Sequence, residues 1–256
     1  MREIGPLCEA KGASRFLSTQ IGGGPENMLL STGQPYFAPY PGFFHKIGLS
    51  DVFVALDDVQ FPQGTTWVSR NRFKNSGGAF WMTIPVRRKG LGLQKISEAR
   101  LSYDDDRWVR KHPESLRSAY SDAPYFREHF AWVEEIFATK CERLVDFNMR
   151  FLERLLEELR LPAKIVRLSD LGITAQGNAL LAEVCEKMGS RSLLVQRSAA
   201  KYLDLGFFRS AGIELRFFNP LSPVYPQLWG NFAPNLSALD LLFDCGPKAR
   251  EITMRK

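Results

Sequence analysis

Two arginines lie two residues apart in the stretch 69-SRNRF-73, a spacing that can form an anion-binding site. In an extended chain, side chains at positions i and i+2 point to the same side, so Arg70 and Arg72 would lie next to each other. Two planar guanidinium groups placed in this way form paired hydrogen bonds with a carboxylate or a phosphate. Arginines that are simply solvated are the competing interpretation. Asn71, which stands between them, is a further candidate for substrate binding.

The segment 33-GQPYFAPYPGFF-44 has the composition of a rigid binding loop. Its prolines fix backbone angles and so reduce the entropy that is lost when a ligand orders the loop. Gln34 has an amide that both donates and accepts hydrogen bonds, and Tyr36 and Tyr40 have rings that can line a pocket or stack on a sugar or a base. We predict that these residues bind substrate, and burial in the core is the alternative for the aromatic side chains.

Three nearby side chains are candidates for the proton acceptor of an enzyme: Asp57, Asp58 and His45. Asp57 and Asp58 are adjacent at the end of an apolar strand, so their carboxylates would point to opposite faces and one of them would reach a shared crevice. This arrangement differs from the carboxylate pair of a glycosidase. Gln60, which follows closely, is a candidate for substrate binding.

The segment 219-NPLSPVYPQLWGNFAPN-235 is a third loop rich in polar and aromatic side chains. We predict that Tyr225 and Gln227 in this loop bind substrate. The helix expected after it carries Asp240 among apolar residues. A buried carboxylate in such a position needs a partner, and the candidate partner is an arginine of the 69–73 stretch.

Apolar patterns separated by turn signals predict strands and helices in alternation. The expected strands are 28–33, 51–59, 79–86, 164–169, 192–196 and 213–218. The expected helices are 41–49, 104–120, 124–139, 141–160, 177–188, 199–210 and 236–245. This order predicts an α/β fold in which a mostly parallel sheet is flanked by helices, with a helical insertion in the middle of the chain at about 100–160.

The three unusual loops, at 33–44, 57–75 and 219–235, each follow an expected strand. Because ligands bind at the carboxyl ends of the strands in an open parallel sheet, we expect these loops to form one site. Residues 1–27 contain the stretch 22-GGGPEN-27 and lack apolar periodicity, so they are predicted to form a mobile N-terminal extension. Residues 28–256 are predicted to form a single α/β domain.

Composition and missing motifs narrow the classes of function. The net charge of +6 and the pI of about 9.2 favour a small-molecule partner with negative charge. The basic residues are scattered, so nucleic acid is not expected as a partner, with transfer RNA left open as a donor. The cysteines and histidines lack metal-ligand spacing, so we expect no metal, no cofactor and a cytoplasmic location. No apolar run reaches the length of a membrane span.

The motifs GxGxxG, GxxxxGK[ST], GxSxG and HExxH are absent from the sequence. A Rossmann dinucleotide site, a P-loop, an α/β-hydrolase and a zincin therefore lose their usual support. A series of short segments, in order from about residue 29 to residue 246, instead resembles the WbqC-like protein family. The segments include QPYFAPYPGFFHKI, DVFVALDDVQF, SRNRF, FWMTIPV, YSDAPYF, SAAKYLD, AGIELRFF, PVYPQ and NLSALDLLFDCG.

The resemblance implies a bacterial cytoplasmic protein linked to the biosynthesis of O-antigen or another surface polysaccharide. It also implies a transferase for glycine or another aminoacyl group. The resulting hypothesis is an enzyme that joins an activated acyl or aminoacyl group to the amine of an amino sugar or a related compound. The alternatives are a relative of nucleotide-dependent ligases and nucleotidylyltransferases, and a binding protein without catalytic activity.

Overall fold

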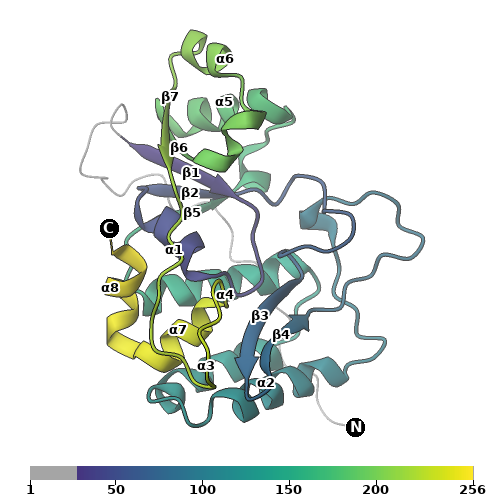
Figure 1. Cartoon of the computed structure of the whole chain (residues 1–256). Coiled ribbons are helices and arrows are strands. Elements are labelled where there is room, and N and C mark those ends of the chain that lie inside the picture. The colour runs from purple at the N-terminus through teal and green to yellow at the C-terminus, as the bar shows by residue number, and fades with distance from the viewer. Residues whose placement is uncertain (1–27, 256) are drawn as a thin grey trace.

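The computed structural model describes residues 28–255, and the extension predicted at 1–27 lies outside them. Its centre is a sheet in which every pairing is parallel, with helices against both faces (Figure 1). The strands of this sheet are β1 (Leu29–Gly33), β2 (Val52–Ala55), β5 (Lys164–Arg167), β6 (Ser192–Gln196) and β7 (Glu214–Phe218). The predicted α/β fold with a mostly parallel sheet is therefore confirmed.

The α-helices of the described chain lie between and after these strands. They are α1 (Pro41–Gly48), α2 (Arg107–Tyr120), α3 (Phe126–Ala138), α4 (Leu144–Glu158), α5 (Gly177–Met188), α6 (Leu205–Ser210), α7 (Ala238–Cys245) and α8 (Ala249–Met254). The helices α2, α3 and α4 make up the helical insertion predicted at about 100–160. Whether residues 28–256 behave as one domain stays a prediction.

The strands of the sheet lie in the order β5-β2-β1-β6-β7. From β1 the chain moves to one side, through β2 to β5, and then returns to the other side of β1 for β6 and β7. The switch point therefore lies between β1 and β6, which pair over Leu29–Ser31 and Ser192–Leu194. In doubly wound sheets, ligands bind outside the carboxyl ends of the strands at such a point.

The sheet separates two apolar cores, because successive side chains of a strand point to opposite faces. Leu30, Val52 and Val54 belong to the core that lies under α5 and α6. Phe53 belongs to the larger core, which α1 forms together with the helical insertion and α7. A sheet covered on both faces requires apolar residues at successive strand positions, and this is the pattern at 52–55.

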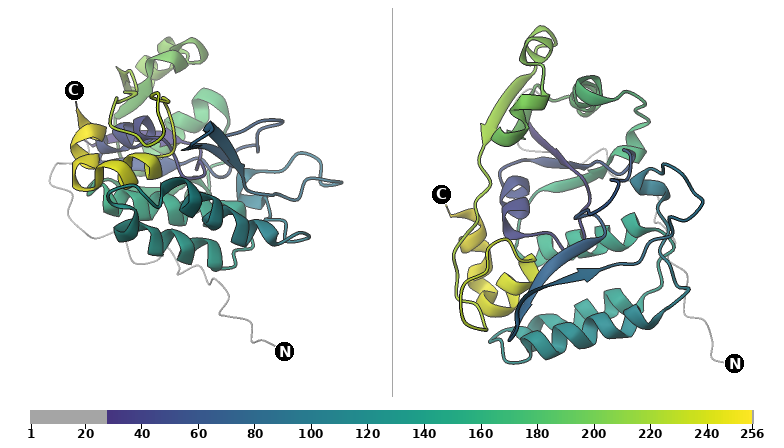
Figure 2. Two further views of the ribbon diagram at one scale, coloured as in Figure 1. Left: turned by 60° about the horizontal axis from the view of Figure 1, so that its bottom comes forward. Right: turned by 45° about the vertical axis from the view of Figure 1, so that its right-hand side comes forward.

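A separate antiparallel hairpin packs beside the helical insertion. It consists of β3 (Arg70–Asn75) and β4 (Gly78–Thr83), which pair with each other and with no strand of the main sheet. The right-hand view of Figure 2 shows the hairpin between the sheet and the long helices of the insertion. The sequence indicated a loop over 57–75, and this is wrong for residues 70–75, which form β3. Asn71 and Phe73 point inward at alternate positions of the strand. The polar residues between them hide this alternation in the sequence.

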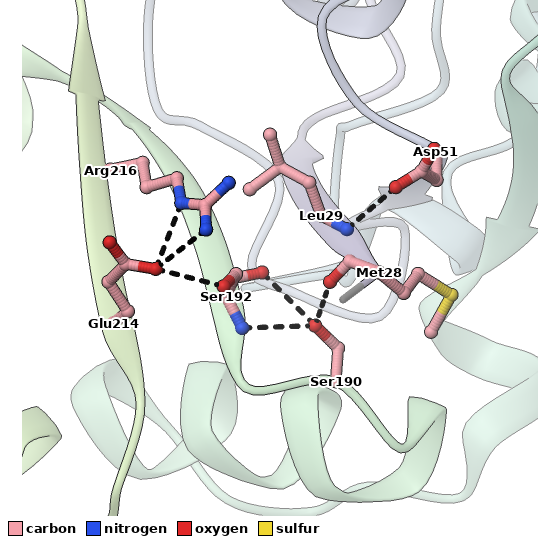
Figure 3. A network of polar contacts seen from close by, with 7 residues as sticks. All are labelled: Met28, Leu29, Asp51, Ser190, Ser192, Glu214 and Arg216. Carbon is pink, nitrogen blue, oxygen red and sulfur yellow. Dashed lines mark hydrogen bonds and ion pairs between the residues drawn. The ribbon is translucent and has the colours of Figure 1, made fainter. Parts of the chain in front are cut away.

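Polar contacts within the chain connect the amino ends of β1, β6 and β7 (Figure 3). The Ser190 hydroxyl donates a hydrogen bond of 2.5 Å to the carbonyl oxygen of Met28. The Glu214 carboxylate accepts a hydrogen bond from the Ser192 hydroxyl at 3.2 Å and pairs with Arg216 at 2.8 Å. These polar groups at the amino edge already have hydrogen-bond partners within the chain. A ligand is therefore expected at the opposite edge of the sheet, at the carboxyl ends of the strands.

Candidate functional site

The outer face of the β3–β4 hairpin carries both predicted arginines beside a tryptophan. Arg72 pairs across the strands with Trp81, and Arg70 pairs with Thr83, so these side chains emerge on one face. The Arg70 guanidinium stacks on the Trp81 ring at 3.8 Å, and that of Arg72 lies 6.0 Å from the same ring. The Trp67 ring lies 5.3 Å from the Trp81 ring. We call Trp67, Arg70, Arg72 and Trp81 the arginine–tryptophan face.

The arginines of this face have no acidic partner. Neither guanidinium forms an ion pair with any residue of 28–255. Arg70 Nε is buried and lacks a hydrogen-bond acceptor, and Arg70 lines a cavity of about 310 Å³ next to residues 64–66. Both arginines are half-buried, which strengthens their attraction for an anion relative to a fully hydrated charge. The pair can therefore hold a carboxylate or a phosphate.

The predicted tyrosines extend this face toward the sheet. The Tyr40 ring lies 6.4 Å from the Trp67 ring, and Tyr36 precedes it in the same loop. Burial raises the pKa of both hydroxyls, and the proximity of Tyr36 raises the pKa of Tyr40 further. Both hydroxyls therefore remain protonated at neutral pH and can donate hydrogen bonds to a ligand. Gln34 is half-buried, and its amide makes no hydrogen bond to another residue in the part of the chain that the structure describes.

Buried asparagines hold the loop that carries these tyrosines. Asn71 Nδ2 donates to the carbonyl oxygens of Phe37 and Ala38 at 2.9 and 2.5 Å. Asn148 Nδ2, on α4, donates to the carbonyl oxygen of Pro35 at 2.8 Å. Both asparagines are completely buried. The amide of Asn71, which we predicted to bind substrate, is thus directed into the fold, where it fixes the loop against β3.

The same loop contains a strained residue. Ala38 has a φ angle of 40°, in the left-handed region that residues with a Cβ atom seldom adopt. Such a conformation costs on the order of 1–3 kcal/mol and persists where surrounding contacts enforce it. Here the enforcing contact is the hydrogen bond from Asn71 to the Ala38 carbonyl oxygen.

Two of the predicted proton acceptors make contacts within the fold. Asp57 is 1% exposed, and its carboxylate accepts hydrogen bonds from the Ser169 N–H at 2.9 Å and the Ser169 hydroxyl at 2.7 Å. Burial raises the pKa of Asp57, and these hydrogen bonds oppose the rise. His45 is buried, with Nδ1 2.9 Å from the carbonyl oxygen of Thr253 and its ring stacked on Phe218. Asp57 therefore fixes the chain after β5, and His45 joins α1 to α8.

Asp58 and Gln60 line an open groove of about 470 Å³ between the segment after β2 and the start of α5. The Asp58 carboxylate accepts hydrogen bonds from Lys95 Nζ at 2.8 Å and from the Ser97 hydroxyl at 3.3 Å. The Asp58 side chain remains 24% exposed, so it is the predicted proton acceptor that a ligand can most readily reach. The loop that follows Gln60 runs along the chain from this groove to the cavity beside Arg70.

The loop at 219–235 begins at the carboxyl edge of the sheet and then leaves it. Figure 1 shows it running from β7 past α1 to α7. The Trp229 indole N–H donates to the carbonyl oxygen of Ala119, near the end of α2, at 2.7 Å. The same loop contacts the 57–75 segment through Gln227, which accepts a hydrogen bond from Lys74, so the expectation that the three loops form one site stays a prediction.

Asp240 is the centre of a buried network, and its partners are not the arginines that we expected. Its carboxylate accepts hydrogen bonds from the hydroxyls of Tyr120 and Tyr225 at 2.9 and 2.7 Å. The buried Lys74 donates to Gln227 Oε1 at 3.2 Å. Burial raises the pKa of Asp240, and the tyrosine hydrogen bonds and the charge of Lys74 oppose the rise. Tyr225 and Gln227, predicted to bind substrate, lie in this network, where Tyr225 is buried and Gln227 is half-buried.

Trp67 and Trp81 were missed by the sequence analysis. Trp81 is 46% exposed and lies on a strand whose neighbouring positions, Phe80 and Met82, point the other way. An exposed tryptophan opposite an arginine on a hairpin can indicate a binding site. This signal can be recognised only once the register between β3 and β4 is known.

Known proteins share most of the chain that builds this site. The model of the WbqC-like protein family matches residues 34–252. The chain belongs to the WbqC-like protein family. The match covers the predicted site residues from Gln34 to Gln227, and so the WbqC-like region includes the arginine–tryptophan face. No solved structure matches this chain.

A relative shares this WbqC-like region. The chain is 32% identical over 218 residues to the uncharacterized protein Rv1507c of Mycobacterium tuberculosis (strain ATCC 25618 / H37Rv). That similarity covers 84% of this chain and 93% of the relative. Among the described residues of this WbqC-like protein, no helix has both the length and the apolar character that a membrane crossing requires.

Proposed function

We propose that this WbqC-like protein is a transferase that forms an amide, by moving an acyl or aminoacyl group, glycine among them, onto the amine of an amino sugar or a related compound. Biosynthesis of a bacterial surface polysaccharide such as O-antigen is the setting that the family resemblance implies. In this proposal the arginine–tryptophan face binds the anionic part of a substrate, and the tyrosines beside it line the position of a sugar or a base.

The observation that carries the proposal is the unpaired state of Arg70 and Arg72. A half-buried guanidinium usually has a carboxylate or several acceptors as partners, because burial removes part of its hydration. Here two such groups lie on one strand face, against Trp81, without any ion pair in the described residues. A ligand with a phosphate or a carboxylate next to a flat ring would satisfy both the charges and the exposed indole.

The proposed reaction needs a proton acceptor but no covalent intermediate. The amine nitrogen attacks the carbonyl carbon of the donor, the new carbon–nitrogen bond forms, and the bond to the leaving group breaks. The proton released from the amine passes to a carboxylate, for which Asp58 is the best placed of the predicted residues, since its side chain is partly exposed and lines the groove. Gln34, whose amide is free, orients the acceptor.

A second function, a nucleotide-dependent ligase, is favoured by one specific observation. The order β5-β2-β1-β6-β7 corresponds to 3-2-1-4-5 when the parallel strands are numbered along the chain, and this is the order of the first five strands in the doubly wound sheet that binds nucleotide cofactors. A ligase of this kind would activate a carboxylate with a nucleotide and then form the same amide. The two functions differ in whether a nucleotide is consumed.

Mass spectrometry of reaction mixtures tests both functions. Purified protein is incubated with amino sugars and their nucleotide-linked forms, together with glycine and ATP, glycyl-tRNA or acetyl-coenzyme A. An amide product formed from an activated donor without ATP supports the transferase, and a product that requires ATP supports the ligase. Ligand binding without any product would support the third hypothesis, a binding protein, and would contradict the proposed activity.

A matched control variant distinguishes the role of the arginine–tryptophan face from a general effect of replacing an arginine. Arg72→Lys keeps the charge but loses the planar fork, so we expect product formation to fall markedly. Arg107→Lys changes an exposed arginine that is paired with Asp105 and should leave the activity unchanged. Equal activity of the two variants would contradict the role of Arg72 in substrate binding.

A further inference from the structure

A lysine ammonium lies at the switch point of the sheet, apart from the arginine–tryptophan face. Lys46 extends from α1, and its Nζ donates a hydrogen bond to the carbonyl oxygen of Thr32, on β1. No other hydrogen bond or ion pair involves Nζ within residues 28–255. An ammonium has three donors, so two of them remain for a ligand.

The direction of the Thr32 carbonyl places this ammonium between β1 and β6. The carbonyl oxygens of Leu29 and Gly33 accept hydrogen bonds from β2 and the residues around it. Because carbonyl directions alternate along a strand, the carbonyl of Thr32 points to the opposite side, where β6 lies. The pairing of β1 with β6 ends at Ser31, so beyond it Lys46 Nζ occupies the place where a backbone N–H would continue the ladder.

The charge of Lys46 is not compensated within the fold. Burial is the cause that lowers the pKa of its ammonium, to about 8. The residue as a whole is half-buried. No charged group of the described residues contributes to this shift, and burial is its only cause.

Gln34 lies two residues beyond Thr32 along the chain. Gln34 follows Gly33 at the carboxyl end of β1, is half-buried, and makes no hydrogen bond to the rest of the described chain. An ammonium and an amide N–H at the carboxyl end of the central strand form a pair of donors suited to oxygen atoms that carry negative charge. The general position of ligands in doubly wound sheets is the same crevice.

We propose that Lys46 and Gln34 form a binding site for an oxyanion, namely the phosphate or carboxylate group of a ligand, at the switch point between β1 and β6. This site goes beyond the proposed function, because Lys46 has no role there and neither Arg70 nor Arg72 is used; the two proposals share Gln34. Binding of the oxyanion stabilises the protonated form of Lys46, so a proton is taken up with the ligand when the pH is above about 8.

Isothermal titration calorimetry with inorganic phosphate, at matched ionic strength, tests the proposal. We expect saturable binding to the wild type and to an Arg70→Lys, Arg72→Lys double variant, and loss of binding when Lys46→Met is added to the double variant. Lys187→Met, which removes an exposed lysine, is the matched control and should bind as the wild type does. Acetate in place of phosphate distinguishes a carboxylate site from a phosphate site, and binding of either supports the proposal.

The pH dependence gives a second readout that a structural role of Lys46 would not produce. Between pH 7.5 and 9.5 the protonated fraction of a lysine with a pKa of about 8 falls, so the apparent Kd should rise roughly twentyfold. Lys46→Arg keeps its charge over this range, and any binding that it retains should lose this dependence.

Three results would overturn the proposal: phosphate affinity that Lys46→Met leaves unchanged in the double arginine variant, absence of saturable binding to either anion, or affinity independent of pH in the double arginine variant. Lys46→Met should fold, because methionine has a similar length and removes a buried charge; circular dichroism verifies this. If that variant does not fold, Gln34→Ala replaces it, and unchanged affinity there contradicts the site. Loss of binding in the double arginine variant with retention in Lys46→Met would assign the anion to the arginine–tryptophan face instead.

Discussion

Asp244→Asn should stabilise the protein above neutral pH and have little effect in acid. Asp244 lies on α7, one turn from Asp240, and its Oδ2 atom is buried without a hydrogen-bond partner. Burial, and next the charge of Asp240, raise the pKa of Asp244 from 3.8 to about 7. Asparagine has nearly the same shape and no charge, so it removes the cost of ionising this position while its amide oxygen can still accept from the Leu228 N–H.

The sign of the effect follows from the raised pKa. Below about pH 4 the carboxyl is protonated in both the folded and the unfolded chain, and the substitution changes little. As the pH rises from about 4 to 7, the unfolded chain ionises first, so stability is lost until the folded pKa is passed. At about 1.4 kcal/mol for each pH unit between the two values, the full loss is about 4 kcal/mol. Because solvent reaches part of the residue, we expect a gain of about 2–4 kcal/mol at pH 8.

Chemical denaturation of the wild type and Asp244→Asn at pH 4.5 and pH 8 measures this effect. The variant should be more stable at pH 8 by the amount given, with a difference of at most about 1 kcal/mol at pH 4.5. Asp122→Asn, at an exposed position without an ion pair in the described chain, is the control and should show no change at either pH. A variant that is less stable than the wild type at pH 8, or equally stabilised at both pH values, would refute the assignment of a strained buried carboxyl.

Further predictions concern the loop and the hairpin. Asn71→Ala should lower the free energy of unfolding by about 2–4 kcal/mol in urea denaturation, because it leaves the carbonyl oxygens of two loop residues buried without donors. Ala38→Gly should raise it by about 1 kcal/mol, since glycine adopts the observed φ of 40° without strain, and a loss of stability would show that the angle is not enforced. Trp81→Ala should change stability by less than about 1 kcal/mol, because the ring is 46% exposed, but should weaken the binding of any ring-containing anion measured by calorimetry.

Local sequence patterns correctly predicted the helices and strands whose ends are set by neighbouring residues. The helix expected at 177–188 has these bounds in the structure, because Gly189, with a φ of 68°, ends it in the left-handed conformation. The strand expected at 192–196 likewise matches β6. The strand β3 was not predicted, because Arg70, Arg72 and Lys74 place a charged residue at every second position and give the segment the composition of a loop.

The site depended on contacts that no local pattern contains. The aspartate at 240 was expected to pair with an arginine, but its partners, Tyr120 and Tyr225, come from α2 and from a loop, and a pairing over such a sequence distance is decided by the packing of whole elements. The placement of Arg70 and Arg72 on one face was predictable from the strand period. Their stacking on Trp81 was not, because it depends on the register of a hairpin that was itself not predicted.

The most direct test of the central claim is the affinity of the wild type and of Arg72→Lys for a panel of ATP, uridine diphosphate N-acetylglucosamine, acetyl-coenzyme A and glucosamine 6-phosphate, measured by calorimetry. We expect at least one of these anions to bind the wild type. Arg72→Lys should weaken that binding by about 1–3 kcal/mol, the scale of a charge-assisted hydrogen bond, and should leave the free energy of unfolding unchanged. Equal affinities of the two proteins for every anion that binds, or the absence of binding to any of them, would contradict the claim that the arginine–tryptophan face is the substrate site.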